Sequence, residues 1–207
     1  MNTFKPKTDS SLCMTALNDL ERYMTVARDW ANTHFPHFTR QISPSYTLDD
    51  FLDGIQIVLE PLLAARGEEI DAVTELDSSR TIKINLGRIL LKDEPEKIAL
   101  LLHEMIEGYG YGSCLHRAMF GFRPEHEYAE FVEHHYRLER GLPRCPLALT
   151  ETEFGIMQKV DAFYRAFPIK RRYLGDTLYQ IIKKDPKIIV NKQLRDEVLE
   201  KCVYDLE

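Results

Sequence analysis

The stretch Arg-Thr-Ile-Lys-Ile-Asn-Leu, residues 80–86, decides the fold class. Its apolar and polar residues alternate, so Ile82, Ile84 and Leu86 share one face of an extended chain. Residues 70–76 form a second short candidate strand, and a segment of turn-forming residues separates the two. The pattern predicts a β-hairpin with a half-buried strand. Because apolar residues elsewhere recur at helical spacing, we expect an α+β fold that is mostly helical.

On both sides of this hairpin, apolar residues recur at helical spacing along most of the chain. Two predicted helices begin at capping-box patterns, Thr47 with Asp50 and Asp93 with Glu96. The glycine-rich run 108–112 is expected to end the second of these. The predicted helices cover residues 12–34, 47–67, 93–107 and 124–140, with two or three more after residue 142.

These elements divide the chain into four segments. Residues 1–12 are expected to be a disordered tail and residues 13–67 a set of N-terminal helices. Residues 68–141 form the core that carries the candidate site, and residues 142–207 a C-terminal helical extension. A length of 207 residues suits one domain with such additions.

The candidate site lies in the helix after the hairpin, in Leu-His-Glu-Met-Ile-Glu at residues 102–107. His103 and Glu107 are four residues apart, so they project from one helix face and can hold a single metal ion. Glu104 lies beside His103, where it could act as the general base toward a water molecule. An ion pair between His103 and Glu107 on a helix surface would give the same spacing without a metal. The choice therefore depends on the surrounding sequence.

A catalytic zinc ion needs a third protein ligand, and the next predicted helix offers candidates. Glu127, Glu130 and His134 are three and four residues apart and share one face of that helix. His116, in the connection between the two helices, is a further candidate ligand. Tyr109, beside the site helix, is a candidate hydrogen-bond donor to an oxyanion.

The order of these motifs resembles that of the ImmA/IrrE-type zincin-like metallopeptidases. That family combines an Arg-Thr-Ile-x-Ile-Asn edge strand, a His-Glu-x-x-His helix and a following helix that supplies the third ligand. The matching residues here are the run 80–85, the Leu-Leu-His-Glu of the site helix and the Glu-x-x-x-Phe at residues 127–131. The resemblance spans about residues 68–140, roughly a third of the chain. It implies a zincin-like core, with a small sheet, an active-site helix and a third-ligand helix.

The resemblance implies a metal-dependent peptidase that hydrolyses a peptide bond in a protein substrate. It assigns His103, Glu107 and Glu127 as ligands of Zn²⁺ and Glu104 as the general base. It also implies that the half-buried strand lines the cleft and pairs through its edge with an extended substrate. His126 is expected to face away from Glu127, and so to be a weaker candidate ligand.

This chain departs from the family at Glu107, which gives His-Glu-x-x-Glu in place of His-Glu-x-x-His. One histidine and two carboxylates form a harder ligand set, for which Mn²⁺ or Fe²⁺ competes with Zn²⁺. Two alternatives stay open. One is a zincin-like binding or regulatory module that has lost catalysis. The other is a carboxylate-bridged di-metal helical protein that uses His103 and Glu107 together with Glu130 and His134.

The charge and composition restrict the partners and the compartment. A net charge of −6 argues against a protein that coats nucleic acid. Residues 165–195 nevertheless carry +7, so an anionic partner (nucleic acid, lipid or an acidic protein) is expected only there. No apolar run approaches the roughly 20 residues of a membrane span. Four scattered cysteines and a polar start without a secretory signal predict a cytoplasmic protein, or one delivered into a host cytosol.

Overall fold

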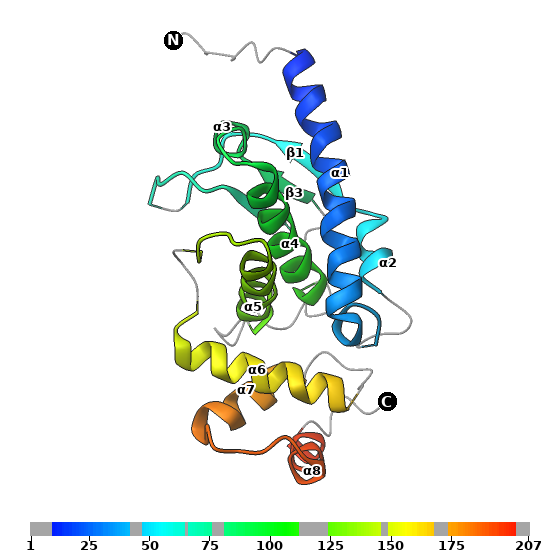
Figure 1. Ribbon diagram of the computed structural model, residues 1–207, viewed down its shortest axis with the longest axis vertical. Helices are drawn as coiled ribbons and strands as arrows, with labels where there is room; N and C mark the ends of the chain where they lie inside the picture. The colour runs from blue at the N-terminus through cyan, green and yellow to red at the C-terminus, as the bar shows by residue number, and fades with distance from the viewer. Residues whose placement is uncertain are drawn as a thin grey trace.

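The computed structural model describes residues 10–41, 47–64, 66–75, 81–111, 124–145, 149–167 and 174–201. They form a mostly helical α+β fold (Figure 1). The chain begins with α1 (Ser10–His34), the short π-helix η1 (His37–Gln41) and α2 (Leu48–Leu52). The strands β1 (Gln56–Leu59), β2 (Ala72–Glu75) and β3 (Thr81–Ile84) follow, and then α3 (Leu86–Ile89). The remaining helices are α4 (Glu94–Tyr111), α5 (Pro124–Glu139), α6 (Glu151–Ala166), α7 (Leu174–Lys184) and α8 (Lys192–Lys201).

The strands form a small mixed sheet in the order β1-β3-β2. β2 and β3 pair antiparallel, with Thr74 opposite Ile82, which confirms the predicted hairpin. β1 adds to the other side of β3 in parallel, with Ile57 opposite Ile82. The strand expected at the sheet edge and half-buried is therefore the central strand, with Ile82 and Ile84 fully buried. β2 is the strand that forms an edge beside the site.

β1 lies in the region that was expected to continue a helix over residues 47–67. The predicted capping box is present, because Oγ1 of Thr47 accepts from the N–H of Asp50 and Oδ2 of Asp50 accepts from the N–H of Thr47. α2 nevertheless ends at Leu52, so the longer helix was a wrong prediction. The β-branched residues 57–58 favour an extended chain, and pairing with β3 outweighs the helical spacing of the apolar residues.

α4 continues through the glycine-rich run that was expected to end it. At Gly108 the helix lies so close to α2 and β2 that a Cβ atom would be 2.7 Å from Cζ of Phe51 and 2.8 Å from Cγ2 of Thr74. Glycine at this position permits close packing and does not terminate the helix. At the other end of α4, Oδ1 of Asp93 accepts from the N–H of Glu96 (2.9 Å), as the capping pattern predicts.

α4 occupies the centre of the molecule and contacts α1, α5 and β2 (Figure 1). α1 is joined to the end of α5 by Trp30, the only tryptophan in the sequence. Nε1 of Trp30 donates to Oε2 of Glu139 (2.8 Å). The indole stacks on His34 and meets the ring of Tyr136 edge-on.

The three C-terminal helices lie at one end of the molecule, where α6 packs on α5 and α7, and α7 packs on α8 (Figure 1). A buried polar cluster connects α6 to the rest of the fold. Oδ1 of Asp161 lies 2.6 Å from Nε2 of His37 and accepts from the hydroxyl of Tyr128 (2.7 Å), while Oδ2 accepts from Nε of Arg165 (2.6 Å). None of the described helices combines the length and the apolar character that crossing a bilayer requires.

Candidate metal centre

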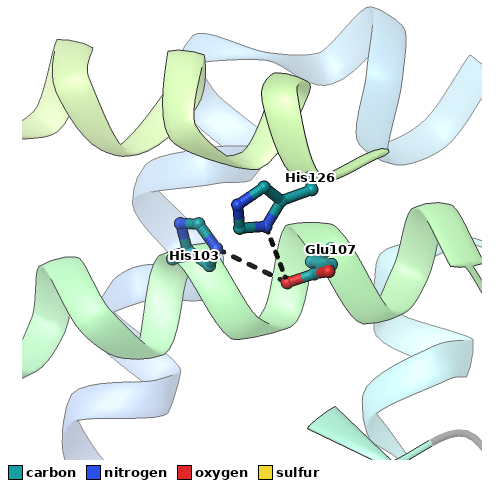
Figure 2. A group of neighbouring side chains, drawn as sticks. All are labelled: His103, Glu107 and His126. Carbon is teal, nitrogen blue, oxygen red and sulfur yellow. Dashed lines mark hydrogen bonds and ion pairs between the residues drawn. The ribbon is translucent and has the colours of Figure 1, made fainter. Parts of the chain in front are cut away.

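Three side chains from two antiparallel neighbouring helices converge where the helices face each other. α4 presents His103 and Glu107 one turn apart, and α5 presents His126 opposite them (Figure 2). One nitrogen or oxygen from each of the three lies within 4.8 Å of the others. Oε2 of Glu107 is 3.4 Å from Nε2 of His103 and 3.3 Å from Nδ1 of His126. The predicted pair on α4 therefore meets a potential third ligand on α5.

The second nitrogen of each imidazole faces a carboxylate of α5. Nδ1 of His103 lies 2.9 Å from Oε2 of Glu133, and Nε2 of His126 lies 3.2 Å from Oε1 of Glu130. In metal sites, a carboxylate at this position orients the imidazole ring and fixes which nitrogen carries the proton. Both histidines of the cluster have this environment.

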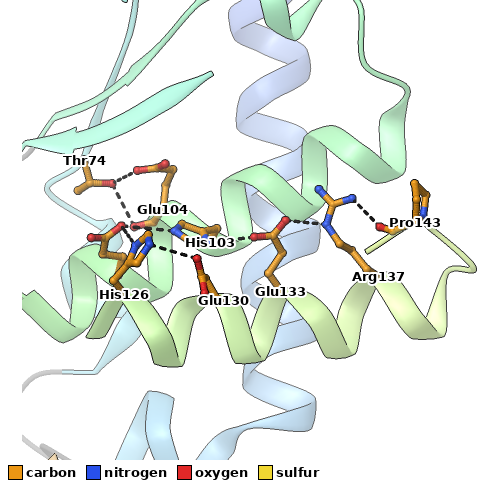
Figure 3. Close-up of polar contacts among 9 residues, drawn as sticks. Thr74, His103, Glu104, His126, Glu130, Glu133, Arg137 and Pro143 are labelled. Atoms are coloured by element: carbon orange, nitrogen blue, oxygen red, sulfur yellow. Dashed lines mark hydrogen bonds and ion pairs between the residues drawn. The ribbon is translucent and has the colours of Figure 1, made fainter. Parts of the chain in front are cut away.

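A buried arginine holds one of these carboxylates in place. Nε of Arg137 donates to Oε1 of Glu133 (2.6 Å), and Nη1 donates to the carbonyl oxygen of Pro143 (3.3 Å). Glu133 is 5% exposed and Arg137 9% exposed, so their ion pair is shielded from water. Figure 3 shows these contacts as a continuous row along α5, from His126 to the residues after the helix.

Glu104 lies beside the cluster and against the sheet. Its side chain is buried, and Oγ1 of Thr74 on β2 donates to its Oε2 (2.7 Å; Figure 3). The same hydroxyl lies 3.1 Å from the backbone oxygen of Glu104. Burial raises the pKa of this carboxyl above its ordinary value. A carboxylate with a raised pKa is a stronger base, which is the property that a general base needs.

The carboxylates around the two imidazoles give the cluster a strong preference for positive charge. Hydrogen bonds to Glu107 and Glu130 raise the pKa of His126 to about 9. Burial opposes a charge on His103, but hydrogen bonds to Glu107 and Glu133 outweigh it and raise the pKa of His103 as well. Burial alone would raise the pKa of Glu107. The hydrogen bonds to His103 and His126 outweigh burial and lower this pKa to about 2. The cluster therefore attracts cations, either protons or a metal ion.

Glu127 and His134, which were candidate ligands, lie on another face of α5. Glu127 interacts electrostatically with Tyr179 of α7, and its Oε2 is buried without a hydrogen-bond partner among the described residues. The ring of His134 packs edge-on against Phe154 of α6. Neither side chain lines the cavity at the site, whereas Glu130 does. The pairing of Glu130 with His134 that a di-metal site would use is therefore not brought to His103.

His126 faces away from Glu127 as expected, and for that reason it reaches His103 and Glu107. Sequence reasoning missed its place in the site because the face of the helix had been chosen from Glu127. A signal was available in the spacing. His126, Glu130, Glu133 and Arg137 follow one another at four, three and four residues, which is a single polar stripe on a helix.

The other two candidate residues have different positions. Tyr109 is buried in the apolar core against Phe38 and Phe51, with ring centroids 5.5 Å and 6.3 Å away. It is not among the residues that line the cavity at the site. His116 lies outside the described residues.

A cavity of about 670 Å³ opens between β2, α4 and α5 and contains the cluster. Its sheet side is lined by residues 69–71, which precede β2, and by three consecutive residues of β2 itself, 72–74. A strand face would contribute alternate residues, so consecutive residues indicate that the backbone edge of β2 borders the cavity. On the opposite side lie His126, Glu130 and Glu133 of α5.

The donor atoms of the cluster suit a transition metal. Two imidazoles and one carboxylate make up the His₂Glu set of catalytic zinc sites, which leaves a further coordination position open. The sequence predicted one histidine and two carboxylates. With His126 in place of Glu127, the composition becomes two histidines and one carboxylate, although the carboxylate now comes from α4 and the second histidine from α5.

Known proteins give no independent indication. Comparisons of the chain with protein-family models, curated proteins and solved structures return no match.

The basic segment 165–195 makes several contacts within the protein itself. Arg165 is bound to Asp161 of the buried cluster, and the guanidinium of Arg195 lies over an aromatic ring. Residues 168–173, which carry three of its basic side chains, lie outside the described part of the chain. An anionic partner at this segment stays a prediction.

Proposed function

We propose that the protein is a divalent-metal hydrolase that cleaves peptide bonds, with a metal ion held by His103, Glu107 and His126. The observation that carries this proposal is the convergence of these three donors in a cavity that also contains Glu104. The composition of the donor set favours Zn²⁺ over Mn²⁺ or Fe²⁺, because two imidazoles make the site softer than one. When bound, the ion would polarise a carbonyl group and make water more acidic.

Glu104 is the general base of the proposed reaction. Its Oε2 is engaged by Thr74, which leaves Oε1 to take a proton from the attacking water. The same carboxyl then returns this proton to the amine that leaves when the C–N bond breaks. Because Glu104 neighbours a ligand in sequence and is fixed by β2, its position relative to the ligands is set by α4 and the sheet together.

The edge of β2 supports an extended polypeptide as the substrate. β2 pairs with β3 on one side only, and its other edge borders the cavity. Backbone N–H and C=O groups along such an edge can hydrogen-bond to a peptide that adds as a further strand. The sequence predicted this role for the strand at residues 82–86, but β3 is the central strand of the sheet, and both of its edges are paired.

A zincin-like core is part of the same proposal. The order of a strand hairpin, a His-Glu helix and a ligand-bearing helix agrees with the resemblance to ImmA/IrrE-type metallopeptidases. The exchanged positions of the carboxylate and the second histidine distinguish this chain from that pattern. The exchange keeps the number of each donor type, so the chemistry of the set is retained.

The test combines metal analysis with cleavage. The full chain is purified without chelator, its metal content is measured, and the zinc-loaded protein is incubated with a peptide library read by mass spectrometry. We expect one zinc per chain and defined cleavage products. Glu104→Gln is expected to keep the zinc and to lose cleavage by about 100-fold or more. Glu200→Gln, an exposed change on α8, serves as the matched control.

Three outcomes overturn the proposal, one through the metal centre and two through the peptidase. A protein that holds no stoichiometric metal contradicts the metal centre. A protein that binds zinc but yields no products in the library, or whose Glu104→Gln variant cleaves as well as the wild type, contradicts the peptidase. If the protein binds zinc but yields no cleavage products, the function that stands is the zinc-binding module without catalysis.

A further inference from the structure

The two imidazoles of the cluster are oriented in opposite ways. His103 turns Nε2 toward Glu107 at 3.4 Å, whereas His126 turns Nδ1 toward the same carboxylate at 3.3 Å. Each ring has only two nitrogens, so the remaining one points elsewhere. For His103 this is Nδ1, and for His126 it is Nε2.

Each remaining nitrogen has a carboxylate partner on α5. Glu133 lies 2.9 Å from Nδ1 of His103, and Glu130 lies 3.2 Å from Nε2 of His126. An ionised carboxylate only accepts hydrogen bonds, so in the metal-free protein each ring nitrogen that faces a carboxylate carries a proton, including those directed at Glu107. A metal ion held among the three donors would replace the protons on the nitrogens directed at Glu107, and the protons toward Glu133 and Glu130 would remain.

The carboxylate next to His103 is itself fixed. Glu133 accepts from Arg137 at 2.6 Å through its second oxygen, and Arg137 is tied by Nη1 to the backbone beyond α5. Rotation of Glu133 away from His103 would break the buried ion pair with Arg137. The buried ion pair with Arg137 therefore keeps Glu133 in its hydrogen bond to His103. This hydrogen bond keeps the proton of His103 on Nδ1.

We propose that the two histidines bind the metal as opposite tautomers, His103 through Nε2 and His126 through Nδ1. In this arrangement Glu133 and Glu130 are the positioning residues that select the coordinating nitrogen. The proposal rests on the metal centre described under the proposed function, but it does not depend on peptide cleavage. It gives the site two residues that would not touch the metal: Glu133, which was not among the candidate ligands of the sequence, and Glu130, which was a candidate ligand there and is a positioning residue here.

The tautomers can be observed directly. Long-range ¹H–¹⁵N correlation spectra of the ¹⁵N-labelled, zinc-loaded protein show for each ring which nitrogen carries the proton and which binds the metal. We expect His103 to be protonated at Nδ1 and His126 at Nε2. Two rings that coordinate through the same nitrogen type would overturn the proposal. A wild-type protein that binds no zinc would overturn both this proposal and the metal centre, so the two failures are distinct.

Affinity measurements test the positioning residues. Zinc dissociation constants are compared by chelator competition for Glu133→Gln, Glu130→Gln and the surface control Glu200→Gln. We expect each of the first two to weaken zinc binding by about 10–100-fold and the control to leave it unchanged. Circular dichroism of the metal-free variants shows whether they fold. If Glu133→Gln does not fold, Glu130→Gln carries the test, because within the described part of the chain no arginine pairs with Glu130 as Arg137 pairs with Glu133. Affinities within about 3-fold of wild type would refute the positioning role.

Discussion

His126 and Glu127 are neighbours on α5, yet their side chains have opposite roles in the fold. His126 lies with His103 and Glu107, whereas Glu127 faces α7 and has one buried oxygen without a partner among the described residues. Burial raises the pKa of Glu127, so its charge is disfavoured where it lies. A proposed metal ligand and a destabilised carboxyl therefore occupy consecutive positions.

Substitution at these two positions gives opposite expectations. His126→Ala removes a ligand, so we expect zinc affinity to fall by more than about 100-fold, beyond the effect of a residue that only orients a ligand. Glu127→Gln, the matched change next to it, is expected to leave the affinity within about 3-fold of wild type. Isothermal titration with zinc measures both. A large loss in Glu127→Gln with little loss in His126→Ala would restore the ligand set expected from the sequence.

The sequence identified the residues of α4 because His103, Glu104 and Glu107 belong to one helix. Their relative positions follow from helical geometry alone. The third ligand depends on how α5 is rotated about its axis, and one residue changes that direction by about 100°. The rotation is decided by packing between helices, which a single sequence does not display. Glu130 was identified from either choice of face because it lies between the two.

At the scale of elements, Gly108 is the position where α4 meets both α2 and β2. A methyl group there would overlap Phe51 and Thr74. Thr74 also holds Glu104, so a displacement of β2 would move the proposed general base. The glycine thus couples the packing of three elements to the site.

Gly108→Ala is expected to destabilise the protein by about 1–3 kcal/mol, the usual cost of overpacking a core. Gly155→Ala in α6 is the matched control, because a Cβ there meets nothing within 4 Å. We expect that control to stabilise the protein by about 0.5–1 kcal/mol, since alanine is the better helix former. Urea unfolding of both variants measures the difference. Equal effects of the two substitutions would contradict the close contact at Gly108.

The buried cluster around Asp161 predicts a dependence of stability on pH. Burial alone would raise the pKa of Asp161, but the hydrogen bonds from His37, Arg165 and Tyr128 outweigh it and lower this pKa below 3.8. A carboxyl with a lowered pKa in the folded state contributes its full stability above the unfolded pKa and loses it as the pH falls through the folded value. The cluster should therefore weaken in acid.

Asp161→Asn is expected to lower the free energy of unfolding at pH 7 by about 2 kcal/mol, because it removes the charge that strengthens the hydrogen bonds accepted from Tyr128 and Arg165. The difference from wild type should shrink below pH 4, where Asp161 itself becomes protonated. Urea unfolding from pH 3 to pH 7 measures it, with the exposed Asp196→Asn as the control. A difference that stays constant over this range would contradict the lowered pKa.

The elements that sequence patterns located well are those with local signals. The N-cap residues Thr47 and Asp93 each predicted the start of a helix. The alternation of Ile82 and Ile84 predicted the hairpin. The helix predicted over residues 56–59 was wrong because a short apolar run fits a helix or a strand equally well. The pairing with β3 that makes it a strand is a contact between residues distant in sequence. The prediction that the glycine-rich run ends α4 was wrong because the packing role of Gly108 depends on its contacts with α2 and β2.

At the scale of the whole molecule, a bound metal would join α4 to α5. Neither helix provides a complete site, so the unfolded chain has no preformed one. Zinc at 100 times its dissociation constant is therefore expected to stabilise the fold by about 2.7 kcal/mol, or roughly 5–10 °C in Tm. Differential scanning calorimetry with zinc and with added chelator measures the shift. His126→Ala should show no shift, and an equal shift in that variant would place the zinc elsewhere.

The hydrogen bond from Trp30 to Glu139 gives the protein a built-in optical probe. Because Trp30 is the only tryptophan in the sequence, the tryptophan fluorescence has a single source. That source lies where α1 meets the end of α5 and is 7% exposed, so its emission should shift to the red when these helices separate. Fluorescence would then follow the release of one helix, while circular dichroism follows the loss of all of them. Superimposable curves from the two signals would show that the helix carrying His126 leaves α1 only when the whole protein unfolds.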